Sequence, residues 1–320
     1  DTFWGKWLWQ NPKMFEELKV FMDEIHKTGA KLFIQLTAGM GRSWAITELV
    51  GPLHKNKFTR AIVKPIIDTS HELASPSAQP ARWAPDIICP EMTKEQIHEI
   101  IEAFAKTAKL CKEAGVDGVE VHAVHEGYLL DQFSIEFFNK RTDEYGGSFE
   151  NRYRFAAEVV KAIKESCGSD FPVSLRYSVL SKVKDFGVGA VPGEEYTEIG
   201  RDMEESEKAA KYLQDAGYDM LLEKPFAPNE EEMREIVECA RKNNSKVMIC
   251  HVLRYNPIYA TIKNSIISGE IGDVINIQMV ESVSYHHLST SYVRGKWANS
   301  DECHTSMLLA KCCHDIDIMM

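Results

Sequence analysis

Residues 118–155 read GVEVHAVHEGYLLDQFSIEFFNKRTDEYGGSFENRYRF. The stretch opens on an alternating apolar run around Val119 and Val121, which is typical of a buried strand. Polar residues follow directly after that run, and burying them without partners would be costly. In α/β folds, ligands bind where the carboxyl ends of parallel strands meet. The stretch therefore predicts a ligand site at the end of a buried strand.

The second half of the stretch combines charged residues with two adjacent glycines, Gly146 and Gly147. Adjacent glycines between charged residues indicate a tight turn. Ion pairs between the charged residues are expected to hold this turn. The segment around it carries Arg141, Asp143, Tyr145, Asn151, Arg152 and Arg154. An ordinary strand, turn and helix with surface charges is the alternative for any one of these residues, but not for the whole string.

The motif EGYL followed by NKRTDEYGGSFENRYRF has a fixed spacing and resembles the old yellow enzyme family of flavin-dependent oxidoreductases. It is most similar to the branch with 2,4-dienoyl-CoA reductase and the bile-acid-inducible NADH:flavin oxidoreductases. The resemblance covers roughly residues 1–220. It implies a TIM barrel that binds FMN, with NAD(P)H as a candidate electron donor. The implied reaction is the reduction of activated C=C bonds in enones or enoyl thioesters.

Three residues after the buried strand are candidate catalytic groups under this resemblance: His122, His125 and Tyr128. A phenol can donate a proton without carrying charge beforehand, so Tyr128 is the predicted acid. The two histidines are predicted to hydrogen-bond the substrate carbonyl and stabilise the developing enolate. Glu126 is an extra residue relative to the simpler family pattern. A shift of one residue along a strand moves each side chain to the opposite face of the sheet. Only one of the two histidines is therefore expected to face the flavin.

Gln35 and Arg176 are the candidate flavin-binding residues. At the position of Gln35 the resembled family has a Gln that contacts the flavin pyrimidine ring, and an amide offers both a donor and an acceptor. At the position of Arg176 it has an Arg beside flavin N1 and C2=O, where a fixed cation raises the electron affinity of the flavin. The alternatives are a satisfied core amide for Gln35 and a salt bridge to a carboxylate for Arg176.

Helices and strands alternate through residues 1–222, as they do in a (β/α) barrel. Helices are predicted at residues 12–29, 93–114, 151–166 and 198–216, the second with a capping box of Thr93 and Gln96. Strands are predicted at residues 31–36, 119–121, 172–177 and 218–222, and a long irregular region at residues 43–92. These strands would be the third to the sixth of the barrel. The missing first two strands and the absent initial Met both indicate a fragment.

A second pattern begins after Leu222, with EKPFAPNEEEM and the tail VRGKWANSDECHTSMLLAKCCHDIDIM. These segments resemble the glucose–fructose oxidoreductase and inositol dehydrogenase family. There the Lys of EKP lies beside the nicotinamide and the substrate, and a His is catalytic; Lys224 and His314 match these positions. Ala310 departs from that family, which often has an Asp there. The sequence has no GxGxxG after a strand, so a nucleotide phosphate site cannot be placed.

The predicted organisation is an α/β chain built from two incomplete segments. Residues 1–222 form a partial TIM-barrel-like parallel sheet, and residues 223–320 form a dehydrogenase fragment with the end of a Rossmann domain and a small mixed sheet. In the second segment, helices are expected after Asn229 and at residues 256–268, and strands at residues 246–252 and 273–284. Loops that hold the flavin phosphate in the resembled family are missing, so the FMN site is expected to be weak.

Composition and charge limit the classes of molecule that this 320-residue chain is expected to bind. The formal net charge of −11 argues against nucleic acid or an anionic membrane surface as the main partner. No apolar run approaches the ~20 residues of a membrane span. The eight cysteines are dispersed without a CxxC pair, so we expect reduced thiols in a cytoplasmic protein and no metal site. A small molecule is the predicted substrate.

Three functions remain open from the sequence. The leading hypothesis is an FMN-dependent NAD(P)H:flavin oxidoreductase of the ene-reductase type. The second is an NAD(P)-dependent sugar or polyol dehydrogenase with Lys224 and His314 as its acid–base pair. The third is a non-functional fusion, because two incomplete domains would leave sheet edges exposed.

Overall fold

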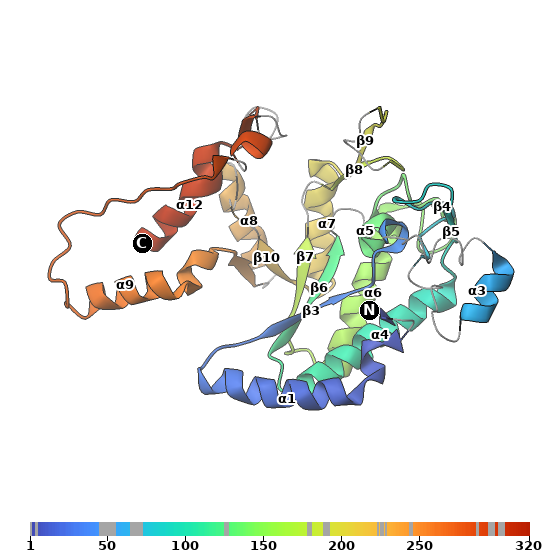
Figure 1. Cartoon of the computed structure of the whole chain (residues 1–320), viewed down its shortest axis with the longest axis horizontal. Helices are drawn as coiled ribbons and strands as arrows, with labels where there is room; N and C mark the ends of the chain where they lie inside the picture. The colour runs from blue at the N-terminus through green and yellow to red at the C-terminus, as the bar shows by residue number, and fades with distance from the viewer. Residues whose placement is uncertain are drawn as a thin grey trace. The chain divides into compact units, whose positions relative to one another are not determined.

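The structure of the chain is a computed structural model (Figure 1). It describes residues 2–3, 6–44, 56–64, 73–124, 128–177, 181–187, 193–222, 224, 227, 229–242, 246–285, 288–293, 298–299 and 305–320. The chain divides into two compact units, Asp1–Met220 and Leu221–Met320.

A parallel sheet forms the centre of the first unit (Figure 1). Its strands are β3 (Phe33–Thr37), β6 (Gly118–Val124), β7 (Val173–Tyr177) and the start of β10 (Asp219–Leu222). They lie in the order β10-β7-β6-β3, and each neighbouring pair is parallel. A helix lies in each connection, as parallel strands require. The predicted α/β fold with a parallel sheet is therefore confirmed.

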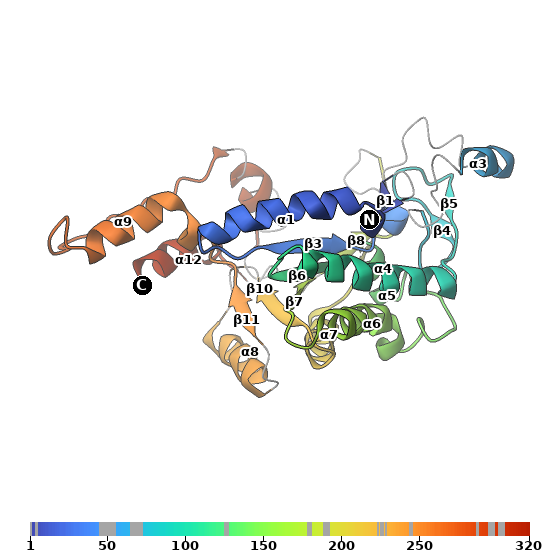
Figure 2. The ribbon, with the colours of Figure 1, turned by 90° about the horizontal axis from the view of Figure 1, so that it is seen from below.

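Four long helices accompany this sheet: α1 (Pro12–Lys27), α4 (Lys94–Glu113), α6 (Phe149–Cys167) and α7 (Met203–Asp215). Figure 2 shows α1 running beside β3, and α4 and α6 next to each other. The predicted capping box at the start of α4 is present. The Thr93 hydroxyl accepts from the Gln96 N–H at 3.2 Å, and Gln96 Oε1 accepts from the Thr93 N–H at 2.9 Å.

One face of the sheet is buried against helices α4 and α6. Successive side chains of a strand point to opposite faces, so alternate residues share this core. The strand residues in it are Leu36, Val119, Val121, Val173 and Leu175, each at most 4% exposed. Burial of each such side chain stabilises the fold by about 1.5–3 kcal/mol. The intervening residues must therefore lie on the opposite face, which leaves that face available for a site.

Short elements complete the first unit. The paired strands are β1 (Thr2–Phe3) with β2 (Lys6–Trp7), β4 (Gln79–Pro80) with β5 (Ile88–Cys89), and β8 (Lys182–Lys184) with β9 (Glu198–Gly200). The short helices are α3 (Lys57–Val63), α5 (Leu129–Ser134), and the 3-10 turns η1 (Leu8–Gln10) and η2 (Gly41–Ser43). The long region of residues 43–92 thus contains only brief regular elements in its described part.

The predicted helix at residues 198–216 is wrong in its first turn. Glu198–Gly200 pairs with β8 instead, and the helix α7 starts only at Met203. Gly200 has φ +147°, and its backbone passes so close to the Ser181 carbonyl that a Cβ would lie 1.8 Å from that oxygen. A helix cannot continue through this contact. Asp202 then caps α7 by accepting from the Glu205 N–H at 2.8 Å.

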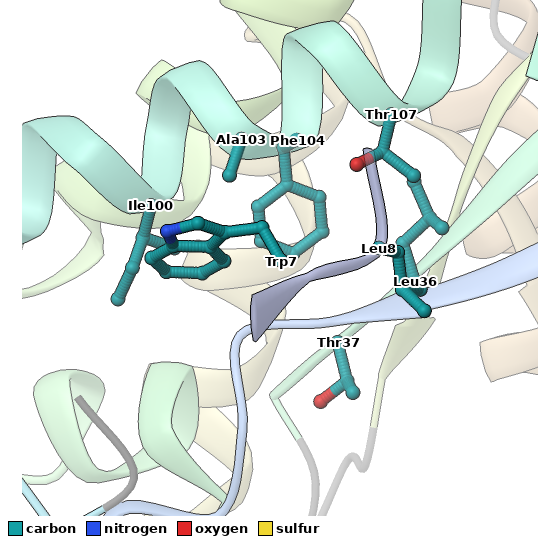
Figure 3. Close-up of a pocket in the computed structure, with 8 residues that line it drawn as sticks. All are labelled: Trp7, Leu8, Leu36, Thr37, Ile100, Ala103, Phe104 and Thr107. Carbon is teal, nitrogen blue, oxygen red and sulfur yellow. The ribbon is translucent and has the colours of Figure 1, made fainter. Parts of the chain in front are cut away.

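The N-terminal segment packs against helix α4 (Figure 3). The indole of Trp7 lies beside Ile100 and Phe104, and with Leu36 and Thr37 these side chains surround a cavity of about 20 Å³. Such a volume holds about one water molecule, so the cavity is a gap in packing and not a ligand site.

The second unit contains the end of β10 and a short strand β11 (Val247–Ile249), joined by a 2.8 Å hydrogen bond from the Cys250 N–H to the Leu222 carbonyl. Its helices are α8 (Glu230–Lys242), α9 (Pro257–Ile267) and α12 (Met307–Met319), with a 3-10 helix η3 (Val252–Tyr255) and a π-helical stretch η4 (Leu288–Val293). Asn229 caps α8 as expected, accepting from the Glu232 N–H at 2.9 Å.

The predicted strand at residues 273–284 is not formed. The segment has no regular secondary structure, and Ile275, Ile277 and Val280 are 91%, 51% and 75% exposed. A strand needs a partner for its backbone N–H and C=O groups, and no described residue pairs with this segment. The small mixed sheet expected in the second segment is therefore absent from the described part of the chain.

Candidate active site at the carboxyl edge of the sheet

The sheet face opposite α4 and α6 carries two neighbouring rows of mostly polar side chains. Strand pairing aligns the first row across the sheet as Gln35, Glu120, Ser174 and Asp219. The second row, nearer the carboxyl ends of the strands, is Thr37, His122 and Arg176. Two residues along a strand span about 6.6 Å, so the rows are adjacent. In a (β/α) barrel, this edge is the one that binds ligands.

Gln35 is held by the residue directly opposite it. Its Nε2 donates a hydrogen bond to Oε1 of Glu120, its register partner on β6. Gln35 is exposed and Glu120 is half-buried. The alternative of a buried, satisfied core amide therefore does not describe Gln35.

Arg176 is exposed near the end of β7, in register with His122 of β6. No hydrogen bond or ion pair joins its guanidinium to any residue that the structure describes. The alternative of a salt bridge to a carboxylate thus lacks a partner in the described part of the chain. A guanidinium at this edge is suited to an anionic or carbonyl-bearing ligand.

His122 and Tyr128 lie together at the end of β6. Their ring centroids are 4.4 Å apart with the planes tilted by 51°, and His122 is 9% exposed. The pairing of β6 with β7 shifts between His122 and Val124, so this strand carries one extra residue there. Such bulges often re-aim side chains beside active sites. Tyr128 follows as the residue before α5, and His125 lies outside the described residues.

A buried ion pair anchors α5, the helix that follows Tyr128. Arg201 Nη1 donates to Asp131 Oδ1 and to the Ser134 hydroxyl, both at 3.1 Å, and the Ser181 hydroxyl donates to the other Asp131 oxygen. Neither charged side chain is exposed. Burial alone would lower the pKa of Arg201, but the adjacent Asp131 carboxylate raises it overall. Sequence reasoning missed this pair, because its members are 70 positions apart.

The predicted ion-paired turn is confirmed. Arg141 binds both carboxylate oxygens of Asp143, at 3.0 and 2.6 Å, and donates to the Met92 carbonyl at 2.6 Å. A Cβ on Gly146 would lie 2.4 Å from the Arg141 carbonyl oxygen, and Gly147 has φ +79°. The turn therefore requires both glycines, and through Met92 it ties the segment before α4 to the turn before α6.

The arginine and asparagine that open α6 also make structural contacts. Arg152 Nη1 lies 2.7 Å from Glu205 Oε1 of α7, and Asn151 Nδ2 donates to the Gly146 carbonyl at 3.1 Å. Arg154 Nε donates to the Glu144 carbonyl at 2.8 Å. The long motif of residues 139–155 thus builds the support around the sheet edge.

Lys224 and His314, the candidates in the second unit, are brought together at helix α12. Lys224 Nζ donates to the Ala310 carbonyl at 2.6 Å, at the position where the resembled dehydrogenases often have an Asp. Burial lowers the pKa of His314, and the charges of Lys224 and His251 lower it further.

His251 and Asp317 complete this cluster, and sequence reasoning did not single them out. The rings of His251 and His314 are 5.8 Å apart, and His251 Nε2 lies 3.8 Å from Asp317 Oδ1. Arg254 binds both oxygens of Asp317, at 2.7 and 2.6 Å. The cluster therefore already contains a counter-ion for its arginine.

Three further observations concern the described residues outside these clusters. A groove of about 350 Å³ is lined by apolar side chains of α1 and β3, including Leu18, Phe21 and Ile34. Within the described residues, no group of three His, Cys, Asp or Glu side chains is placed to hold a metal ion. No described helix has the length and hydropathy needed to cross a membrane.

A parallel βα sheet with polar residues gathered at its carboxyl edge is the arrangement in which α/β proteins bind ligands. The chain belongs to the NADH:flavin oxidoreductase / NADH oxidase family, whose family model matches residues 6–257. The match confirms the flavoprotein resemblance and runs past Leu222, into the segment assigned above to a dehydrogenase pattern.

Cinnamate reductase and NADH oxidase are among the curated relatives that share sequence with the chain. It is 51% identical over 199 residues to cinnamate reductase from Clostridium sporogenes and 34% identical over 200 residues to NADH oxidase from Thermoanaerobacter brockii. Each match covers 62% of this chain but only 27% and 25% of the relative, so the chain spans about a quarter of their length.

A solved structure of morphinone reductase in complex with tetrahydroNAD matches with a TM-score of 0.50 and 23% identity. The match covers 73% of this chain and 59% of that one. This likeness shows a shared fold.

Proposed function

We propose that the chain carries the FMN site of an ene-reductase-type oxidoreductase, which takes electrons from NAD(P)H and reduces activated C=C bonds in small molecules. One observation carries the proposal: strand register aligns His122 with Arg176 beside the Gln35 row, at one edge of one sheet face. The family membership supports it, as do the names cinnamate reductase and NADH oxidase among the relatives.

The residues on this face fit the polar edge of a flavin ring. Gln35 offers an amide, and Arg176 offers a cation without a partner among the described residues. When bound, FMN would supply the hydride chemistry. The Arg176 charge would favour negative charge on the pyrimidine edge through direct Coulomb attraction. We assign both residues to flavin binding.

Tyr128 and His122 are assigned to the substrate. An imidazole that donates a hydrogen bond to the substrate carbonyl stabilises the negative charge that develops on that oxygen. The Tyr128 phenol, packed against the His122 ring at 4.4 Å, then donates its proton to the carbon beside the carbonyl. His125 lies outside the described residues and keeps its predicted role as an alternative donor.

A Tyr128→Phe variant tests the assignment of the acid. With the full chain reconstituted with FMN, we expect NADH-dependent reduction of cinnamate or cyclohexenone, slowed in the variant by about 10²–10⁴-fold. Flavin affinity should stay unchanged, because the phenol is assigned to the substrate. Tyr255→Phe, at a tyrosine 71% exposed in the second unit, is the matched control. Equal rates for the two variants would remove Tyr128 from the mechanism, and flavin-loaded chain that reduces no enone or enoate would refute the reaction class.

The cluster in the second unit supports a second candidate function. We infer that Lys224 and His314 are an acid–base pair of an NAD(P)-dependent sugar or polyol dehydrogenase, because Lys224 Nζ donates to the Ala310 carbonyl at 2.6 Å on the helix that carries His314, whose ring lies 5.8 Å from that of His251. Lys224→Met should then raise the pKa of His314 toward the ordinary value of 6.5. An NMR titration of the His314 ring measures this change, and NAD(P)⁺ reduction with a panel of polyols tests the activity. Absence of that reduction would refute this candidate.

A further inference from the structure

We propose that Glu120 is a positioning residue for the flavin: it orients the Gln35 amide so that the carbonyl oxygen Oε1 remains to accept from the N–H of the flavin pyrimidine ring. The inference rests on the proposed FMN site and deepens it. Nothing in the sequence pattern marks Glu120, which occupies an ordinary position in an alternating strand.

The contact itself determines which end of the Gln35 amide faces Glu120. A carboxylate accepts hydrogen bonds and donates none, whereas the amide donates only through Nε2. The contact therefore joins Gln35 Nε2 to Glu120 Oε1. Gln35 Oε1 is then the acceptor that remains for a ligand.

The sheet holds this pair in place from both sides. Gln35 and Glu120 are register partners in the middle of β3 and β6. Two residues earlier on each strand, Phe33 of β3 pairs with Gly118 of β6. The Phe33 ring covers Gly118 so closely that a Cβ on Gly118 would lie 2.5 Å from the ring. The following row holds His122, which is 9% exposed. The pair is therefore set by backbone pairing and not by a mobile loop.

The orientation matters because the pyrimidine edge of a flavin alternates carbonyl acceptors with one N–H donor. An amide carbonyl facing that N–H makes a hydrogen bond, whereas a flipped amide would set donor against donor. In the free chain the hydrogen bond from Gln35 to Glu120 is exposed to water and contributes little to stability. Under a bound ring the same contact is shielded from water, where an unmade hydrogen bond is costly.

Substitution of Glu120 by Gln removes the restraint with little change in size, because a second amide can pair with Gln35 in either orientation. We would measure dissociation constants for riboflavin and for N3-methylriboflavin, which lacks the pyrimidine N–H, by quenching of flavin fluorescence. The wild-type chain should prefer riboflavin by about three- to tenfold or more. E120Q should reduce this preference at least threefold. Glu165→Gln, an exposed glutamate on α6, should leave it unchanged.

A variant at Gln35 provides an independent arm. Gln35→Leu should abolish the preference, and adding E120Q to it should change nothing further, because Glu120 is argued to act only through the amide. Equal weakening of both flavins by E120Q would show a merely structural role and overturn the inference. An unchanged preference would overturn it as well. A wild-type chain that quenches neither flavin would refute the proposed FMN site, and the positioning role with it.

Discussion

Replacement of Asp131 by Asn tests how the support beneath the sheet edge is held. Asp131 and Arg201 are completely buried and 3.1 Å apart. Asn keeps the shape of the side chain but removes the charge, which leaves the Arg201 guanidinium buried without its counter-ion. Breaking a buried ion pair in this way costs about 3–5 kcal/mol. We expect the lower end, because Arg201 keeps hydrogen bonds to Ser134 and Tyr153 at 3.1 and 3.3 Å.

Urea unfolding followed by circular dichroism and tryptophan fluorescence measures this effect. With a slope of about 1–3 kcal/mol per M, the D131N midpoint should fall by roughly 1–3 M. Asp170→Asn, at an exposed loop position, is the isosteric control and should stay within about 0.5 kcal/mol of wild type. Adding Arg201→Met to D131N should recover part of the loss, because no buried charge is then left unpaired. Equal midpoints for D131N and D170N would refute the reasoning.

Three further predictions concern stability and affinity. Burial alone would raise the pKa of Asp117, but hydrogen bonds, of which that from Lys31 is the strongest, hold this pKa at about 2. Asp117→Asn should therefore lower the free energy of unfolding by on the order of 1–2 kcal/mol at neutral pH. That difference should be complete above pH 3.8 and vanish as the pH falls through 2, in urea titrations at each pH. Gly146→Ala should lower the melting temperature more than Gly147→Ala, because its Cβ meets the Arg141 carbonyl at 2.4 Å whereas Gly147 has only its φ of +79° to strain. FMN and riboflavin should bind within about tenfold of each other, since the ring-edge groups assigned above do not recognise phosphate; a larger preference in a fluorescence titration would reveal a phosphate site.

Local pattern predicted most of the elements, since each of their signals lies within a short stretch. The apolar stripe and capping box of α4 are complete in residues 93–114, and Asn229 marks the start of α8 by itself. The alternating run of residues 273–284 carries an equally clear local signal but forms no strand. Alternation shows that the side chains suit a sheet. A strand also needs a neighbouring strand to pair with its backbone, and the local sequence does not show whether one is present.

The candidate site was predictable where strand ends carry polar residues. His122 and Arg176 follow apolar runs near the ends of their strands, and parallel strands bring such ends to one edge. Gln35 lies in the middle of β3, and the family resemblance marked it. Glu120 escaped notice because its importance depends on register, which pairs it with Gln35 across 85 positions. The Asp131–Arg201 pair escaped for the same reason. Contacts between distant segments depend on the fold, so they cannot be predicted from the sequence of either segment alone.

The central claim is that the polar rows of this sheet face bind a flavin ring. A titration of riboflavin fluorescence with purified wild-type and Arg176→Met chains tests it most directly. The account predicts saturable one-to-one quenching by wild type and an affinity about tenfold or more lower in R176M, because a charge-assisted contact is lost. Lys161→Met, at an exposed position of α6, should bind like wild type. Failure of the wild-type chain to quench, or equal affinities for R176M and wild type, would contradict the account.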